Sequence, residues 1–111
     1  MSSAENFNKE REDLNELVMQ YAGKTTKRFF NLDTNVYKDG ALPAKTKEML
    51  GLVSSLVLRC DDCIKYHLDK CQEQDVNDEE LDEILSVGLI VGGSITIPHI
   101  RRALKFWDEN K

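Results

Sequence analysis

Helical periodicity runs through almost the whole of this 111-residue chain, and the alternating apolar pattern typical of strands is almost absent. In the first segment, Leu14, Leu17, Val18 and Tyr21 recur at the spacing that places them on one face of a helix. Glycine and proline interrupt the pattern at several points, and each interruption marks a helix end or a helix start. The sequence therefore predicts an all-α fold of about six helices.

The interruptions give the expected helix boundaries. Gly23 ends the first helix, Pro43 lies in the first turn of the third, and Asn77 with Glu80 forms a capping box before the fifth. The third helix is apolar around most of its circumference, so we expect it to be the central buried helix. After the first, the expected helices are residues 24–38, 43–58, 61–74, a segment from 78 that ends within 88–93, and 94–109.

Length and composition limit the class of protein. The chain is long enough for one compact domain, residues 1–111, and short enough to gain from assembly with further copies. The net charge of −5, without a basic run, argues against nucleic acid or an anionic membrane surface as partner. The nearly uncharged stretch from Ile84 to Ile97 is too short to span a bilayer, and the first residues lack an apolar signal core. We therefore expect a cytoplasmic protein.

Two cysteines with two residues between them carry the most distinctive chemistry. On a helix, Cys60 and Cys63 would lie about 5–6 Å apart on one face, within the range that a disulfide accepts. His67 follows one turn after Cys63, close enough to take its proton directly or through one water. This spacing in an unsecreted chain favours a redox-active pair or half of a metal site.

The acidity of the two thiols stays open at this point. Free backbone N–H groups at the start of the fourth helix favour a thiolate there, whereas the carboxylates of Asp61 and Asp62 oppose a further negative charge. These two acids are equally well explained as helix-capping charges. The helix start favours Cys60 as the attacking thiol, and the neighbouring His67 favours Cys63.

Zinc binding is the main alternative for the cysteine pair. Cys71 continues the same helical stripe, but it lies roughly 16 Å along the axis from Cys60, too far to share one ion. A fourth ligand would have to be His99 or Glu48. The simpler expectation is that Cys71 is a small buried apolar residue and that His99 packs with its hydrogen bonds satisfied.

Apolar and aromatic residues outside this cluster are expected to serve packing. Phe29, Leu32 and Val36 lie on one side of the second predicted helix, and Phe106 and Trp107 lie near the chain end. We expect them to anchor either the core or a contact between subunits.

The spacing of four residues resembles a known motif. Eleven residues separate Glu48 from Cys60, two separate Cys60 from Cys63, and three separate Cys63 from His67. This spacing is similar to the motif of the alkylhydroperoxidase D-like branch of the carboxymuconolactone decarboxylase family. The resemblance covers residues 42–93, about half of the chain. It implies an all-helical fold that assembles as trimers or hexamers.

The resemblance also implies a reaction. Cys63 would attack a peroxide oxygen and become a sulfenic acid, which Cys60 would capture as a disulfide. His67 and Glu48 would form the proton relay. A dithiol donor, either a protein or a small cofactor such as lipoamide, would reset the disulfide, and the reaction needs no metal or flavin.

Two features depart from the best-known peroxidase members of the family. Those members carry a histidine at the position of Asp62, so the relay here is shorter or different. On one straight helix Glu48 and Cys60 would lie roughly 18 Å apart, so their contact needs a chain reversal or a Glu48 from a neighbouring subunit. The alternative functions are lactone decarboxylation by histidine with glutamate or arginine, and a non-enzymatic redox-sensing module.

Overall fold

The helix signals of the sequence are realised close to the predicted boundaries. The computed structural model describes residues 2–111, and the regular elements in this range are all helices with no strand among them, which confirms the all-α prediction. None of the helices in the described range is long and apolar enough to cross a bilayer. The elements are α1 (Ser3–Tyr21), α2 (Lys24–Val36), α3 (Ala44–Val57), α4 (Asp61–Glu73), α5 (Asp78–Gly92), a short 3₁₀ helix η1 (Ser94–Thr96) and α6 (Ile97–Glu109).

Most boundaries lie within one residue of prediction, with Pro43 as the N-cap of α3 and not in its first turn, but two elements differ more. α2 ends at Val36, two residues early, which releases Tyr37 from the helix. The expected helix 94–109 is divided into η1 and α6, and Pro98 lies in the first turn of α6, where its missing N–H costs no hydrogen bond. The predicted capping box of Asn77 and Glu80 is confirmed at the start of α5.

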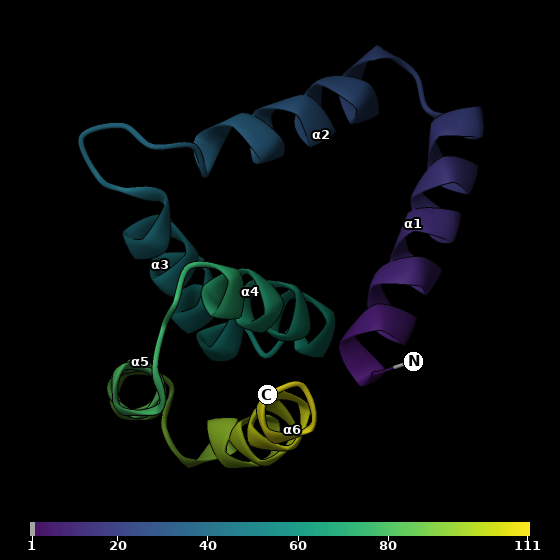
Figure 1. Cartoon of the computed structure of the whole chain (residues 1–111). Helices are drawn as coiled ribbons and strands as arrows, with labels where there is room; N and C mark the ends of the chain where they lie inside the picture. Colours follow the sequence, from purple (N-terminus) through teal and green to yellow (C-terminus); the bar gives the residue numbers. More distant parts are fainter. Residues whose placement is uncertain (1) are drawn as a thin grey trace.

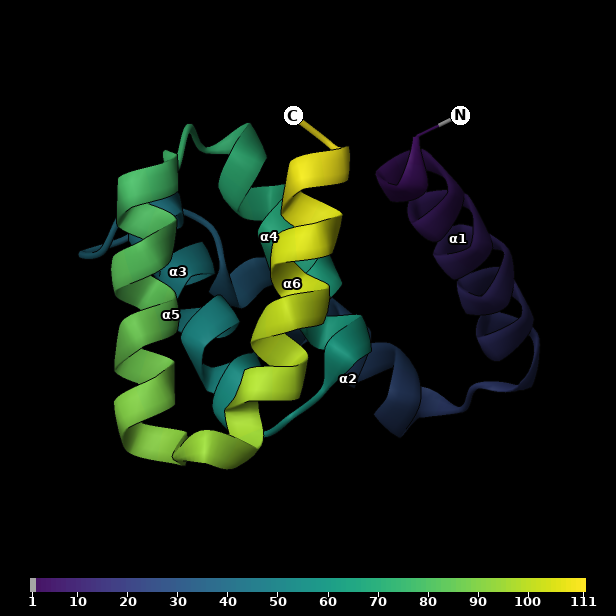
Figure 2. The same ribbon diagram turned by 90° about the horizontal axis from the view of Figure 1, so that it is seen from below.

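Helices α3 to α6 pack together as a body around one core (Figures 1 and 2). Leu52 and Leu56 on α3 are completely buried, which confirms the central position of this helix, although Leu58 at its end is exposed. Gly88 on α5 allows α3 to approach closely, because a Cβ there would lie 2.5 Å from Cδ2 of Leu56. The body core also contains Ile64, Leu68, Cys71, Leu81, Leu85, Phe106 and Trp107.

A tight reversal at residues 58–60 folds α4 back along α3. The N–H of Cys60 donates to the carbonyl of Ser55 and the N–H of Arg59 donates to that of Leu56, the paired bonds of a Schellman motif. Arg59 takes the left-handed conformation (φ 59°) that this motif requires. The reversal therefore places Cys60 directly at the start of α4.

Helices α1 and α2 form an arm that extends away from the body (Figure 1). The first turns of α1 are attached to α6: the N–H of Ala4 donates to Oδ1 of Asn110 at 2.8 Å, and Phe7 meets Phe106 edge to face. No residue of α2 is buried by the rest of the described chain, and Phe29 and Leu32 are 68% and 67% exposed. The apolar face of α2 is therefore not part of the core of its own chain.

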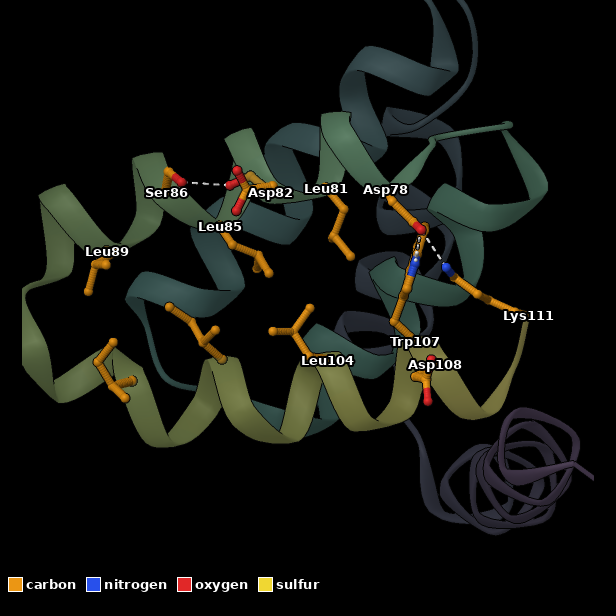
Figure 3. Close-up of a pocket in the computed structure, with 12 residues that line it drawn as sticks. Asp78, Leu81, Asp82, Leu85, Ser86, Leu89, Leu104, Trp107, Asp108 and Lys111 are labelled. Carbon is orange, nitrogen blue, oxygen red and sulfur yellow. Dashed lines mark hydrogen bonds and ion pairs between the residues drawn. The ribbon is translucent and has the colours of Figure 1, made fainter.

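A groove of about 520 Å³ runs between α5 and α6 (Figure 3). Nε1 of Trp107 donates to Oδ1 of Asp78 at 2.8 Å, and Lys111 pairs with the same carboxylate and closes one end. Trp107 and Phe106 are buried against neighbouring helices, as the sequence predicts. The groove contains none of the four predicted site residues; its apolar lining is Leu81, Leu85, Leu89, Ile97, Ile100, Leu104 and Trp107.

Candidate redox site

The start of α4 brings the two predicted sulfurs together. Cys60 is the N-cap residue, and the backbone N–H of Cys63 donates to its sulfur at 3.3 Å. The two Sγ atoms are 2.6 Å apart, and both residues are free cysteines. The pair therefore needs little movement to become linked.

Glu48 and His67 meet in the interior between α3 and α4. Oε2 of Glu48 lies 2.8 Å from Nδ1 of His67, and both side chains are 8% exposed. Because a carboxylate can only accept, Nδ1–H of the ring donates to it. The reversal at 58–60 supplies this contact within one chain, so no glutamate from a neighbouring subunit is needed.

Gly51 sets the depth to which the His67 ring packs. It follows Glu48 by one turn on the same face of α3, and a Cβ at this position would lie 2.6 Å from Cε1 of the ring. Real Cβ atoms essentially never approach so closely, and the contacted atoms belong to a rigid ring. Gly51 therefore leaves the space in which the ring can reach Glu48.

Tyr37 is a site residue that sequence reasoning missed. Its hydroxyl lies 3.4 Å from Nε2 of His67, and the two ring centres are 5.1 Å apart. With Nδ1–H donating to Glu48, Nε2 of the neutral ring accepts from this hydroxyl. Burial, together with the carboxylates of Asp33 and Glu48, raises the pKa of Tyr37. The three side chains form one line of hydrogen bonds from α2 to α3.

Of the two predicted routes from Cys63 to His67, direct or through one water, the direct contact is not formed. Among residues 2–111, the ring nitrogens of His67 are bonded to Glu48 and Tyr37 and to neither sulfur. Cys63, Tyr37 and His67 nevertheless border one hollow of about 530 Å³. A proton leaving Cys63 therefore needs a bridging group in this hollow, such as a water molecule, to reach His67.

The sequence left open whether the thiol pKa is raised or lowered, and the surroundings of Cys63 now give the direction for this thiol. Burial raises its pKa to about 11, and the hydrogen bond and charge of Cys60 and the charge of Asp62 add to this effect. Arg11 of α1 opposes them. Cys63 therefore rests as a thiol near neutral pH and needs a base to become a nucleophile.

A small molecule can reach Cys63 from two sides. Besides the 530 Å³ hollow, a second hollow of about 460 Å³ lies between the arm and α4. Cys63, His67 and Asp33 border both hollows, and Cys60 borders neither. The second hollow is rich in aromatic and apolar groups, contributed by Phe7, Leu14, Phe29, Phe30 and Tyr66. Cys63 is thus the more accessible sulfur.

The residues considered for a metal have other partners. Nδ1 of His99 lies 2.7 Å from Oδ1 of Asp61, so His99 is a hydrogen-bonded packing residue, as predicted. Cys71 is buried, also as predicted, and burial raises its pKa to about 12. Within residues 2–111, no three His, Cys, Asp or Glu side chains are grouped closely enough to hold one ion.

Comparisons with known proteins show what the chain as a whole resembles. A model of the carboxymuconolactone decarboxylase family matches residues 23–106. Two crystal structures of one Thermotoga maritima protein of that family, for which a part in the antioxidative response has been suggested, are 55% identical to this chain. Each match covers 94% of this chain. The matches cover 91% and 88% of the two Thermotoga chains, with TM-scores of 0.92 and 0.90 respectively.

Two more distant relatives extend the comparison. A carboxymuconolactone decarboxylase family protein of Legionella pneumophila shares the fold, with a TM-score of 0.84 at 24% identity over 96% of this chain and 95% of its own. An uncharacterized protein of Cupriavidus necator is 30% identical over 71 residues. That match covers 64% of this chain and 63% of the relative, so this chain spans less than two thirds of it.

Proposed function

Because the chain belongs to the carboxymuconolactone decarboxylase family, we propose that it is a thiol-dependent peroxidase or disulfide oxidoreductase. Cys60 and Cys63 would cycle between dithiol and disulfide. The observation that carries this proposal is the two sulfurs 2.6 Å apart beside a buried Glu48–His67 pair. The antioxidative role suggested for the 55% identical Thermotoga protein supports it.

In the first step, the Cys63 sulfur attacks one peroxide oxygen and the O–O bond breaks. The sulfur becomes a sulfenic acid, and the other oxygen leaves as hydroxide or alkoxide. The thiol proton passes through Tyr37 or a water to Nε2 of His67, where the carboxylate of Glu48 stabilises the imidazolium. His67 then returns this proton to the leaving oxygen, so the step ends in an alcohol or water.

In the second step, the Cys60 sulfur attacks the sulfenic sulfur of Cys63. The S–S bond forms, and the sulfenic oxygen leaves as water with the Cys60 proton. A dithiol, either a protein or a lipoamide-like molecule, then reduces the disulfide through a mixed disulfide. Its attack is expected at Cys63, because this sulfur borders both hollows.

The raised pKa of Cys63 favours a second candidate function. A thiol with a pKa of about 11 holds very little thiolate near neutral pH, so its reaction with peroxide is slow unless the relay assists. Without that assistance the protein would be a redox-sensing module whose disulfide changes its stability or its contacts. The rate with peroxide distinguishes the two functions.

The apolar face of α2 supports a proposal about assembly. We propose that a second copy of the chain covers Phe29, Leu32 and Val36, which are exposed in the single chain. Exposed apolar residues at these spacings are typical of a helix that packs against a partner. The family resemblance implies a trimer or hexamer.

Peroxide consumption in the presence of a dithiol tests the proposed function. We expect turnover to disappear in Cys63→Ser and to stop after one sulfenic acid in Cys60→Ser, whereas Cys71→Ser, which changes a buried cysteine outside the site, keeps it. Cumene hydroperoxide and hydrogen peroxide should be compared as substrates.

Turnover that survives Cys63→Ser contradicts the mechanism, and a wild-type rate equal to that of a free thiol favours the redox-sensing module. Conversion of an anionic lactone by the Cys60→Ser/Cys63→Ser variant would indicate decarboxylation instead.

A further inference from the structure

The two acidic residues between the cysteines have different surroundings. Asp62 is exposed and has no hydrogen-bond or ion-pair partner in the described part of the chain. Asp61 is bound by two side chains of α6: its Oδ1 lies 2.7 Å from Nδ1 of His99, and its Oδ2 lies 2.8 Å from Nε of Arg102. Both oxygens of Asp61 are therefore engaged, and those of Asp62 are free.

The position of Asp61 makes this contact important for the thiols. Asp61 is the first residue of α4 and directly follows Cys60, the N-cap. His99 and Arg102 lie one turn apart on α6, and Arg102 Nη2 also approaches His99 Nδ1 at 3.2 Å. Since the carboxylate is held at both oxygens, the first turn of α4 is tied to α6 at the point where the sulfurs meet.

The negative charge of Asp61 is also balanced by a positive charge beside it. Although burial opposes it, hydrogen bonds from His99 and Arg102 hold the pKa of Asp61 below its ordinary value. Its carboxylate is therefore ionised near neutral pH, next to the permanent positive charge of Arg102. Asp62 lacks such a partner, and its charge raises the pKa of Cys63.

We propose that Asp61, His99 and Arg102 form a clamp that positions Cys60 and Cys63 for disulfide formation. The clamp holds the first turn of α4 in one conformation, so the two sulfurs meet more often than in a fraying helix end. These three are positioning residues, since they act through the cysteines and touch no substrate. The inference rests on the proposed redox cycle and assigns it a determinant outside the family motif.

The equilibrium with glutathione measures the clamp directly. Two protein thiols and one glutathione disulfide give one protein disulfide and two glutathione thiols, so the equilibrium constant is the effective concentration of one cysteine at the other. We expect His99→Leu/Arg102→Met to lower this constant about tenfold, because two charge-assisted hydrogen bonds are lost. Asp61→Asn should also lower the equilibrium constant. His99→Asn, which keeps an N–H near the place of Nδ1, should keep most of the wild-type constant.

Asp62→Asn is the matched control, because it removes the same charge one position away. We expect it to leave the glutathione equilibrium within about twofold of wild type and to speed alkylation of Cys63, since it lowers the thiol pKa. Urea unfolding of the reduced variants shows whether they fold. A constant that stays within twofold of wild type in His99→Leu/Arg102→Met, or falls equally in Asp62→Asn, overturns the clamp and leaves the redox cycle standing. A wild-type pair that never links at any glutathione ratio overturns both.

Discussion

The body and the arm of this molecule use similar amphipathic helices in opposite ways. In the body, α3 buries Leu52 and Leu56 completely beneath the neighbouring helices. In the arm, α2 repeats apolar residues with the same helical period and leaves Phe29 and Leu32 about two-thirds exposed, at 68% and 67%. Periodicity therefore predicts that a helix has an apolar face, and only the packing shows what covers it.

The arm nevertheless contributes to the candidate site. Tyr37, immediately after α2, reaches His67, and Arg11 of α1 lies with its guanidinium 4.0 Å from the ring centre of Tyr66. The body supplies the sulfurs, His67 and Glu48. The site is thus assembled from both regions, and Tyr37 extends the hydrogen bonds of the Glu48–His67 pair to the arm.

Matched leucine substitutions should show the largest difference between the two regions. We expect Leu52→Ala to lower the free energy of unfolding by about 3 kcal/mol, because it leaves a cavity in a fully buried position. Leu32→Ala should change the unfolding of a single chain by less than about 0.5 kcal/mol. Urea titrations followed by circular dichroism at low protein concentration measure both values.

The same pair of variants tests the proposed assembly. If a second copy covers α2, light scattering should show Leu32→Ala dissociating at a higher protein concentration than wild type. Equal losses of stability in Leu52→Ala and Leu32→Ala at every concentration would show that α2 packs on its own body, and the comparison between body and arm would then fail.

Matched glycine substitutions should show a smaller difference. Gly51→Ala places a Cβ 2.6 Å from the His67 ring, so we expect it to cost about 2 kcal/mol of stability and at least about tenfold in peroxide turnover. Gly23→Ala in the arm meets no atom within 4 Å, and its extended backbone suits alanine, so it should be close to neutral. Unfolding and turnover are measured on both, and unchanged turnover in Gly51→Ala would mean that the ring position does not matter.

The sequence predicted the helices well because their ends carry local signals. Gly23, Pro43 and the Asn77–Glu80 capping box act within a few residues of themselves. The division of residues 94–109 into η1 and α6 was not predicted, because Pro98 indicates a kink in a helix that continues across it but does not show that a separate 3₁₀ turn precedes it.

The site was predicted only in part, because some of its contacts depend on the path of the chain and not on local spacing. The spacing placed the sulfurs of Cys60 and Cys63 side by side, but the contact of Glu48 with His67 depends on a reversal at Arg59. The predicted helices leave a break at residues 59–60, but an arginine there does not announce the left-handed conformation that reverses the chain, whereas a glycine would have done so. Tyr37 could not be found by spacing, because the path of the arm decides whether it reaches His67.

The smallest expected effect tests whether the arm lies over the site in solution. Cys63 reacts as a thiolate and has a pKa of about 11, so its alkylation by iodoacetamide should accelerate about tenfold per pH unit from pH 7 toward that value. Arg11 lowers this pKa and Asp62 raises it. At a fixed pH near 8, we expect Arg11→Gln to slow the alkylation of Cys63 roughly twofold and Asp62→Asn to accelerate it by a similar factor, the size of one solvent-screened charge.

Lys9→Gln is the control for Arg11→Gln, because Lys9 lies on the same helix and pairs with Asp13 at the surface. It should leave the rate at Cys63 unchanged when the alkylated peptides are separated by mass spectrometry. An arm that swings away from α4 in solution would make Arg11→Gln as silent as Lys9→Gln while Asp62→Asn keeps its effect. That result would assign the acidity of Cys63 to the body alone, and Tyr37 would then need independent evidence of its contact with His67.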